Sequence, residues 1–120
     1  MSVLETSILK TIKDVIGVED ESIDGYKTFD SVLITHINSA FSVLKQLGVS
    51  DEHYFITGYD ETWGDFFEDK QTLYLVKTYI GFKVQLMFDP PESSHVLKSC
   101  ESIIQEMEWR MNFEVETSIL

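Results

Sequence analysis

The side chains that could perform acid–base or metal chemistry are scattered along the chain. The sequence has 21 Asp and Glu residues, three His residues and one Cys. His36, His53 and His95 fall on three different predicted segments with no nucleophile beside any of them, and Cys100 has no His at a recognisable spacing. Residues 51–61 lack the aligned oxygen ligands and central Gly of an EF-hand loop. Because catalysis needs convergent groups in one cleft, we predict that the protein is not an enzyme and holds no cofactor and no metal ion.

The charge is strongly negative and unevenly distributed. Nine Lys and Arg residues stand against 21 acids, which gives a net charge of −12. Phosphate binding needs a basic face, so this balance excludes an ordinary nucleic-acid binder, and it disfavours docking to anionic membranes. Residues 51–69 carry −7 and residues 89–120 carry −5, whereas residues 70–88 carry +3. A positive helix in an acidic protein favours pairing with an acidic neighbour, which can be another copy of the chain.

Apolar residues recur at helical spacing in four segments, which predicts an all-α fold, a small antiparallel helical bundle of about four main helices. The predicted helices span residues 3–16, residues 30–47, residues 70–88, and Ser93 or Ser94 to Phe113. Gly17 and Gly48 follow the first two helices as C-terminal stops, and Asp89-Pro90-Pro91 ends the third. Since this length is typical of one domain, we expect a single helical domain over residues 1–113 and a short C-terminal tail over residues 114–120.

The segment between the second and third predicted helices, residues 49–69, interleaves acids with aromatic residues and is predicted to be irregular. Thr62-Trp63-Gly64-Asp65 is typical of a capping sequence that opens one short helix. Two interpretations of Trp63 stay open at this point. It anchors the segment to the core, or it contacts another protein, because Trp is enriched at interfaces. The same alternative applies to Trp109, which lies off the main apolar stripe of the last predicted helix.

Three stretches, taken in order, carry a resemblance to a known family. The first comprises Phe29-Asp30-Ser31, His36-Ile37-Asn38-Ser39-Ala40-Phe41 and Leu44-x-x-Leu47-Gly48-Val49. The second is Trp63-Gly64-Asp65-Phe66. The third runs from Val76-Lys77-Thr78-Tyr79-Ile80-Gly81 through Phe88-Asp89-Pro90-Pro91 and is followed by Glu106-x-Glu108-Trp109-Arg110-Met111. Over about residues 3–113 this pattern resembles the head–tail connector (adaptor, or head completion) proteins of tailed bacteriophages, including prophage-encoded members. The resemblance implies a ring-forming structural virion protein. Its copies would assemble, usually as a dodecamer, beneath the portal, after synthesis in the host cytoplasm.

The resemblance further implies that the ring extends the DNA channel and offers a docking platform to the stopper or tail-completion protein, while DNA passes through without specific binding. Three sets of candidate residues follow. The acids expected to face the channel are Asp60, Glu61, Glu68 and Asp69; the expected subunit interface comprises Lys70, Lys77, Lys83 and Trp63; and the expected contact with the portal or another partner comprises Trp109, Phe113, Val115, Ile119 and Leu120. Carboxylates on a channel wall would repel phosphates and let the duplex slide.

The residues alone also allow a small acidic helical interaction or regulatory module, for instance a DNA mimic that inhibits a DNA-binding protein. A mimic needs acids that are spaced like phosphates along one continuous face. Here many of the acids cluster in predicted loops, which disfavours this alternative.

Overall fold

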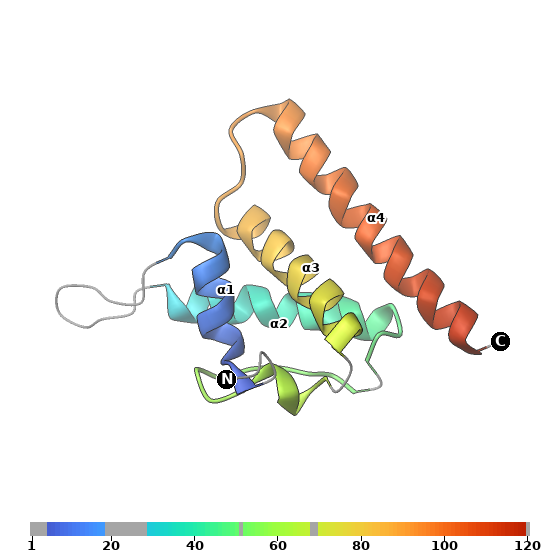
Figure 1. The fold of residues 1–120 in the computed structure, drawn as a ribbon. Helices are drawn as coiled ribbons and strands as arrows, with labels where there is room; N and C mark the ends of the chain where they lie inside the picture. The colour runs from blue at the N-terminus through green and yellow to red at the C-terminus, as the bar shows by residue number, and fades with distance from the viewer. Residues whose placement is uncertain (1–4, 19–28, 51, 68–69, 120) are drawn as a thin grey trace.

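The computed structural model describes residues 5–18, 29–50, 52–67 and 70–119. Its elements are α1 (Ile8–Ile16), α2 (Asp30–Gln46), the short 3₁₀-helix η2 (Trp63–Asp65), α3 (Lys70–Phe88) and α4 (Ser94–Ile119). The described residues form no β-strand, so the predicted all-α helical bundle is confirmed. α3 packs across α2, and α4 runs back along α3 and extends beyond its end (Figure 1).

The two glycines predicted to stop helices do so. Gly17 and Gly48 adopt left-handed φ angles of 80° and 84°, the conformation in which glycine has no steric penalty. After α1, the backbone N–H groups of Gly17 and Val18 donate hydrogen bonds to carbonyls of the last helical turn, and Gly48 and Val49 do the same after α2. Both helices therefore end where the sequence indicates.

The first helix begins later than the sequence predicts, at Ile8 instead of near residue 3. Ser7 caps it, because its hydroxyl oxygen accepts a hydrogen bond from the Lys10 N–H at 3.3 Å. Ser7 also forms an isolated antiparallel bridge with Thr62, and the Ile8 N–H donates to the Glu61 carbonyl at 3.0 Å. The backbone before Ile8 thus pairs with the chain before η2 instead of continuing the helix.

The last helix is longer than predicted, since it continues past Phe113 to Ile119. Its C-terminal part packs on the turn that follows α2. The Asn112 side chain donates a hydrogen bond to the Leu47 carbonyl at 3.0 Å, and a Cβ placed on Gly48 would lie 3.1 Å from Cγ1 of Val115. These tertiary contacts support the helix where the sequence predicts a short C-terminal tail, which is helical over residues 114–119.

The hydrophobic core lies between α1, α2, α3 and the segment around η2. α3 is central to it, and a Cβ on Gly81 of α3 would lie only 3.0 Å from Cγ1 of Val15 in α1. The buried hydrophobic residues are Ile8, Leu9, Ile12, Leu33, Ile37, Ala40, Phe41, Leu44, Ile56, Trp63, Phe67, Leu73, Val76, Tyr79, Ile80, Val84, Ile104 and Met111. Among these described residues only the last two come from α4, so the described part of the longest helix contributes few side chains to the core.

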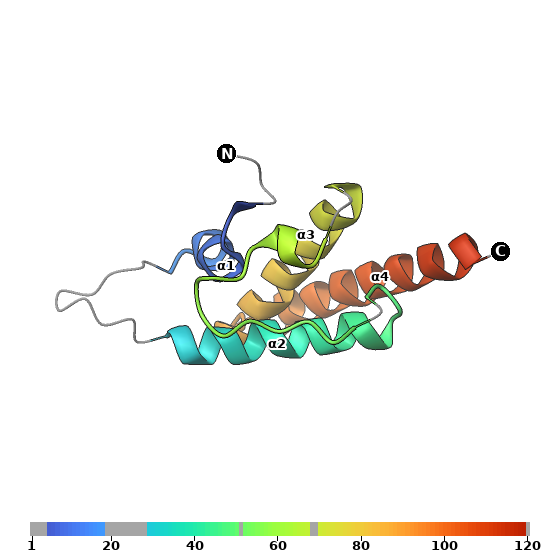
Figure 2. The same cartoon turned by 90° about the horizontal axis from the view of Figure 1, so that it is seen from below.

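The irregular segment over residues 52–67 lies along α2 (Figure 2) and is attached to it by one amide side chain. The Asn38 carbonyl oxygen accepts a hydrogen bond from the Ile56 N–H at 2.7 Å, and the Asn38 NH₂ group donates to the Ile56 carbonyl at 3.0 Å. The same segment stacks Tyr54 on Phe66, with ring centroids 4.5 Å apart, and both rings meet Phe41 of α2 edge-on. Polar and aromatic contacts therefore order a segment that has no regular secondary structure apart from η2.

A buried ammonium group joins the end of α1 to the start of α2. The Lys13 side chain is 1% exposed, and its Nζ lies 2.6 Å from Oδ1 of Asp30 and 2.7 Å from the Tyr59 hydroxyl oxygen. Buried charges need this kind of pairing, because an isolated one would be strongly destabilising. The cluster fixes three segments to one another.

Candidate functional site

The described residues contain no group of three or more His, Cys, Asp or Glu side chains that could hold a metal ion. None of the described helices is long and apolar enough to cross a membrane. The distinctive surface feature is a set of exposed large hydrophobic side chains. Among the residues with a described side chain they are Val15, Phe29, Val32, Phe55, Tyr74, Val96, Ile103, Trp109 and Phe113, and the last four lie on α4. Single exposed apolar residues are common, whereas a concentration on one projecting element indicates an interaction surface.

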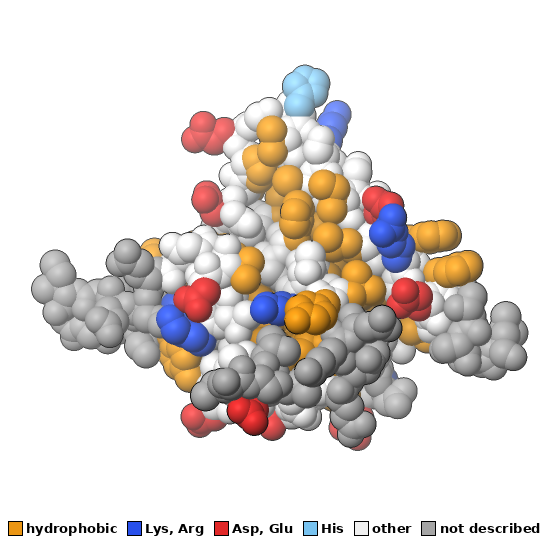
Figure 3. All heavy atoms as spheres, in the orientation of Figure 1, with side chains coloured by type: hydrophobic (Ala, Val, Ile, Leu, Met, Phe, Trp, Pro, Cys, Tyr) orange, Lys and Arg blue, Asp and Glu red, His pale blue; other side chains and the backbone are white. Residues whose placement is uncertain are grey.

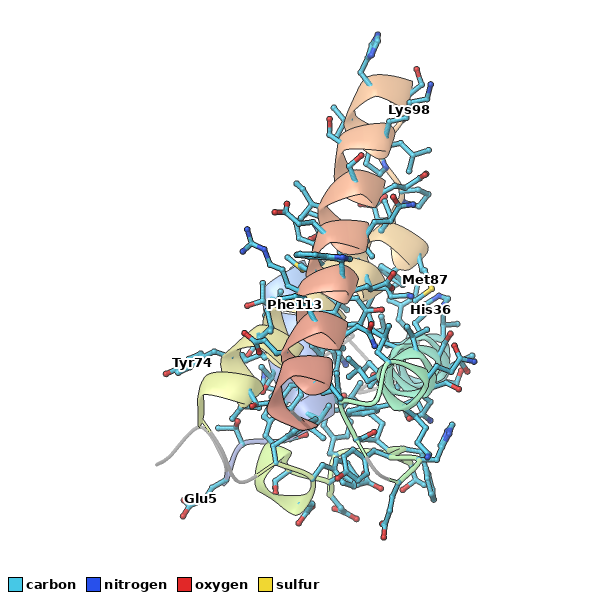
Figure 4. The ribbon with its side chains drawn as sticks, turned by 90° about the vertical axis from the view of Figure 1, so that its right-hand side faces the viewer. Glu5, His36, Tyr74, Met87, Lys98 and Phe113 are labelled. Carbon is cyan, nitrogen blue, oxygen red and sulfur yellow. The ribbon has the colours of Figure 1, made fainter. Side chains whose placement is uncertain are left out.

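An aromatic pair stands on the outer side of α4. Trp109 and Phe113 stack with their ring centroids 5.3 Å apart and their planes at 18°, although they are 64% and 50% exposed. Beside them, Nη2 of Arg110 lies 2.8 Å from Oε1 of Glu106 in an exposed ion pair. Figure 4 views α4 from outside the bundle, with Phe113 labelled on it. Hydrophobic side chains project at the right-hand edge of Figure 3, over the lower half of α4. We call Trp109 and Phe113 the aromatic knob.

The other side of the same part of α4 borders a cavity of about 300 Å³. It lies between α4, the start of α3 and the turn after α2, and its lining residues are Val49, Thr72, Leu75, Val76, Met111, Glu114 and Val115. Five of these seven side chains are apolar. Three elements distant in sequence form the cavity, so no local pattern could have identified its residues.

The predicted partner contact therefore does not form one surface. Trp109 and Phe113 lie together in the aromatic knob, whereas Val115 lines the cavity on the opposite side of α4. The side chain of Ile119 and the whole of Leu120 lie outside the described part of the structure.

A polar cluster links α3 to α4 and involves one of the predicted interface lysines. The Tyr79 hydroxyl donates to Oε2 of Glu108 at 2.6 Å, and Nζ of Lys83 donates to the Tyr79 oxygen at 3.0 Å and to Glu108 at 3.3 Å. Burial, together with the neighbouring Glu108 carboxylate, raises the pKa of Tyr79 well above its usual value of 10.0. Lys83 thus bridges two helices of its own chain, and its role in a subunit contact stays a prediction. Sequence spacing did not reveal this because Glu108 lies on another helix.

The prediction that Trp63 forms a subunit contact is wrong. Its side chain is fully buried, and the indole N–H donates to Oγ1 of Thr11 in α1 at 3.2 Å. The anchoring interpretation is the correct one, and the predicted capping box of Thr62 and Asp65 is present at η2. Of the other predicted interface residues, Lys77 is half-buried on α3, and the side chain of Lys70 lies outside the described residues.

The predicted channel acids differ in their surroundings. Asp60 is exposed. The Glu61 carboxylate instead organises its own loop, because it accepts hydrogen bonds from the N–H and hydroxyl of Thr57 at 2.9 and 2.8 Å and from the Gly58 N–H at 3.3 Å. Burial alone would raise the pKa of Glu61, but these hydrogen bonds outweigh it and lower the pKa below 4.5. Glu68 and Asp69 lie outside the described residues.

A small helical bundle whose last helix carries an exposed aromatic knob on one side and a cavity on the other is suited to binding other protein chains. The chain belongs to the phage connector protein family, whose model matches residues 8–118 of its 120 residues. This match confirms the resemblance carried by the three sequence stretches and indicates a structural role in the phage particle. Comparison with curated proteins found no match, and neither did comparison with solved structures.

Proposed function

We propose that this chain is one subunit of a ring that sits beneath the phage portal, extends the DNA channel and gives the stopper or tail-completion protein its docking platform. Membership of the connector family supports the structural role of the protein. The ring, the portal contact and the stopper contact are the specific parts of the proposal.

The observation that carries this proposal is the exposed apolar surface of α4. Val96 and Ile103 are 50% and 41% exposed, and their spacing of seven residues places them on one side of the helix. Hydrophobic side chains also lie along the upper part of α4 in Figure 3. Burying the exposed half of each such side chain would gain roughly 1 kcal/mol. A projecting helix with several of these side chains is best explained by a protein partner that covers it.

The test of the portal contact uses the full chain and the portal protein from the same phage. Electron microscopy of the mixture is expected to show a ring of connector subunits on the portal. The double variant Val96→Asp and Ile103→Asp should lose this ring, whereas Ser102→Asp, at an exposed polar position of the same helix, should keep it. A wild-type chain that never associates with the portal and is absent from purified particles would refute the proposal.

The channel part of the proposal rests on the net charge of −12 and on exposed Asp60. Asp60 is a better test residue than Glu61, because a Glu61 substitution would also disturb the hydrogen bonds of its loop. Asp60→Lys in the phage should slow DNA ejection or alter DNA retention, since a cation would attract the passing phosphates. If both are unchanged, Asp60 does not line the channel.

The predicted electrostatic subunit contact depends on Lys77, on Lys83 and, outside the described side chains, on Lys70. Sedimentation of the assembled ring at low and high salt tests it, because exposed ion pairs are screened by salt. If assembly does not change with salt, ion pairs do not contribute to the contact between subunits. That result would leave the proposed hydrophobic contact of α4 unaffected.

A further inference from the structure

The last helix, α4, is only lightly embedded in the bundle. It has 26 residues and is therefore about 39 Å long, but among the described side chains it buries only Ile104 and Met111. Its first ten residues, 94–103, include no buried side chain. The cavity of about 300 Å³ lies beneath its last third, so even the docked part is packed incompletely. An element with few buried apolar contacts opens at a lower free energy than the whole domain.

Much of the contact that holds α4 to the bundle is polar and directional. Glu108 accepts a hydrogen bond from the Tyr79 hydroxyl at 2.6 Å and pairs with Lys83 of α3 at 3.3 Å. The Asn112 NH₂ group donates to the Leu47 carbonyl at 3.0 Å. Glu108 and Lys83 are 25% and 20% exposed, so water can replace these partners when the helices separate. The contacts therefore specify where α4 docks more than they prevent it from leaving.

The connector between α3 and α4 favours an extended backbone. α3 ends at Phe88 and α4 begins at Ser94. Residues 89–93 contain no hydrogen-bonded turn and form an open loop at the top of Figure 1. Their proline pair fixes two φ angles near −65° and disfavours a helical residue before it, which is typical of a semi-rigid spacer. Five extended residues span about 17 Å, roughly twice the distance between the axes of two packed helices.

We propose that copies of this chain exchange α4, so that in the ring α4 of one copy docks on α3 and on the turn after α2 of the next copy. The inference rests on the proposed ring and specifies the contact between its subunits. The occupant is a second copy, because the structure shows that α4 matches this surface in its apolar contacts and in the cluster of Tyr79, Lys83 and Glu108. Exchange would make Lys83 part of the subunit interface, as the sequence predicts.

The same contacts form whether α4 docks on its own chain or on the next one, so exchange is a low-cost route to association. Two factors then decide between the arrangements. The stiffness of the proline pair favours a straighter connector, and a portal that holds copies side by side raises the effective concentration of the neighbouring α4. The free chain at low concentration therefore keeps the closed arrangement of Figure 1, and exchange accompanies assembly.

Exchange also has the symmetry that a ring needs. Each copy donates one α4 and receives one, so the contact joins unlike surfaces and closes into a ring when the rotation between copies allows it. Val96 and Ile103 stay exposed in either arrangement, because neither side chain is buried when α4 is docked. The exchange is therefore compatible with the portal contact proposed for these two residues.

Disulfide trapping in the full chain tests the exchange. In a Cys100→Ser background, Gly48→Cys and Val115→Cys place two thiols across the docking site, because a Cβ on Gly48 would lie 4.0 Å from Cβ of Val115, within the range for disulfides. Oxidation of the ring on the portal should give a ladder of covalent multimers. The control pair Val15→Cys and Gly81→Cys, with Cβ atoms 3.8 Å apart, joins α1 to α3 and should give only monomers.

A reversal of charge tests the same contact without a substitution at Gly48, whose φ of 84° disfavours a side chain. Lys83→Glu and Glu108→Lys each place like charges across the α3–α4 contact and should weaken ring formation by about tenfold. An equimolar mixture of the two variants should recover it, because after exchange each reversed charge meets its complement in the neighbouring copy. The two substitutions in one chain are the control, since they restore the pair in either arrangement.

The outcomes separate the exchange from the proposed ring. Rings that yield only internally linked monomers from the Gly48→Cys and Val115→Cys chain overturn the inference. A mixture of the charge variants that assembles no better than its two components overturns it as well. In both cases the ring itself remains, whereas a wild-type chain that forms no ring on the portal overturns the proposed function too.

Discussion

Asn38→Ala should destabilise the fold by detaching the irregular segment from α2. The substitution removes both hydrogen bonds to Ile56, at 2.7 and 3.0 Å, and each is worth about 1 kcal/mol net. Ile56 is only 1% exposed, so its backbone groups would lose these partners in a poorly hydrated place, which costs about 1–3 kcal/mol more. Ala is the better helix former by roughly 0.5 kcal/mol. We therefore expect a net loss of roughly 2.5–4.5 kcal/mol in the free energy of unfolding.

Urea unfolding with linear extrapolation measures this loss. Ser39→Ala is the matched control, because Ser39 is exposed on the same helix and the substitution gives a similar gain in helix propensity. Hydrogen exchange adds a local test. The Ile56 amide should exchange faster in Asn38→Ala, whereas the Val49 amide, bonded to the Leu44 carbonyl at 3.0 Å, should change no more than the global loss of stability requires. A difference from Ser39→Ala below about 1 kcal/mol, with unchanged exchange at Ile56, would refute the reasoning.

Three other predictions concern polar groups. Asp30→Ala removes the carboxylate that pairs with the buried Lys13 ammonium at 2.6 Å, so we expect urea unfolding to show a loss of about 3 kcal/mol; a loss below about 1 kcal/mol would contradict the buried pair. Because the pKa of Tyr79 is raised in the folded state, the protonated Tyr79 hydroxyl stabilises the fold fully below pH 10, and this contribution declines as the pH rises above 10. The free energy of unfolding in alkaline solution should therefore fall more steeply in the wild type than in Tyr79→Phe. The lowered pKa of Glu61 means that its loop loses order as the pH falls below 4.5, and an NMR titration of the Thr57 amide with a midpoint at or above 4.5 would contradict this.

The sequence predicts the helices well where burial and local caps agree. The apolar stripe and Gly48 place α2 correctly, and the capping pair Thr62 and Asp65 places η2. These features depend on residues within a few positions of one another, which is the range over which periodicity and capping operate. The start of α1 was misplaced because Ser7 pairs with Thr62, more than fifty residues away.

The candidate interaction surface was predictable only in part. Trp109 is recognisable from the sequence because it lies off the apolar stripe of its helix, and the structure exposes it. Lys83 and Trp63 could not be assigned in the same way, since their environments come from Glu108 and Thr11 on other helices. The cavity next to Val115 depends on three packed elements, so it is a property of the fold and not of any one segment.

The buried contact between Lys13 and Asp30 has a practical consequence for engineering the particle. The two residues flank residues 19–28, and the 2.6 Å ion pair joins the end of α1 to the start of α2. Lengthening a connection whose ends are already held costs little, because loop-closure entropy grows only slowly with length. A peptide tag inserted between residues 19 and 28 should therefore leave the bundle intact, and the proposed ring would then carry one tag per copy.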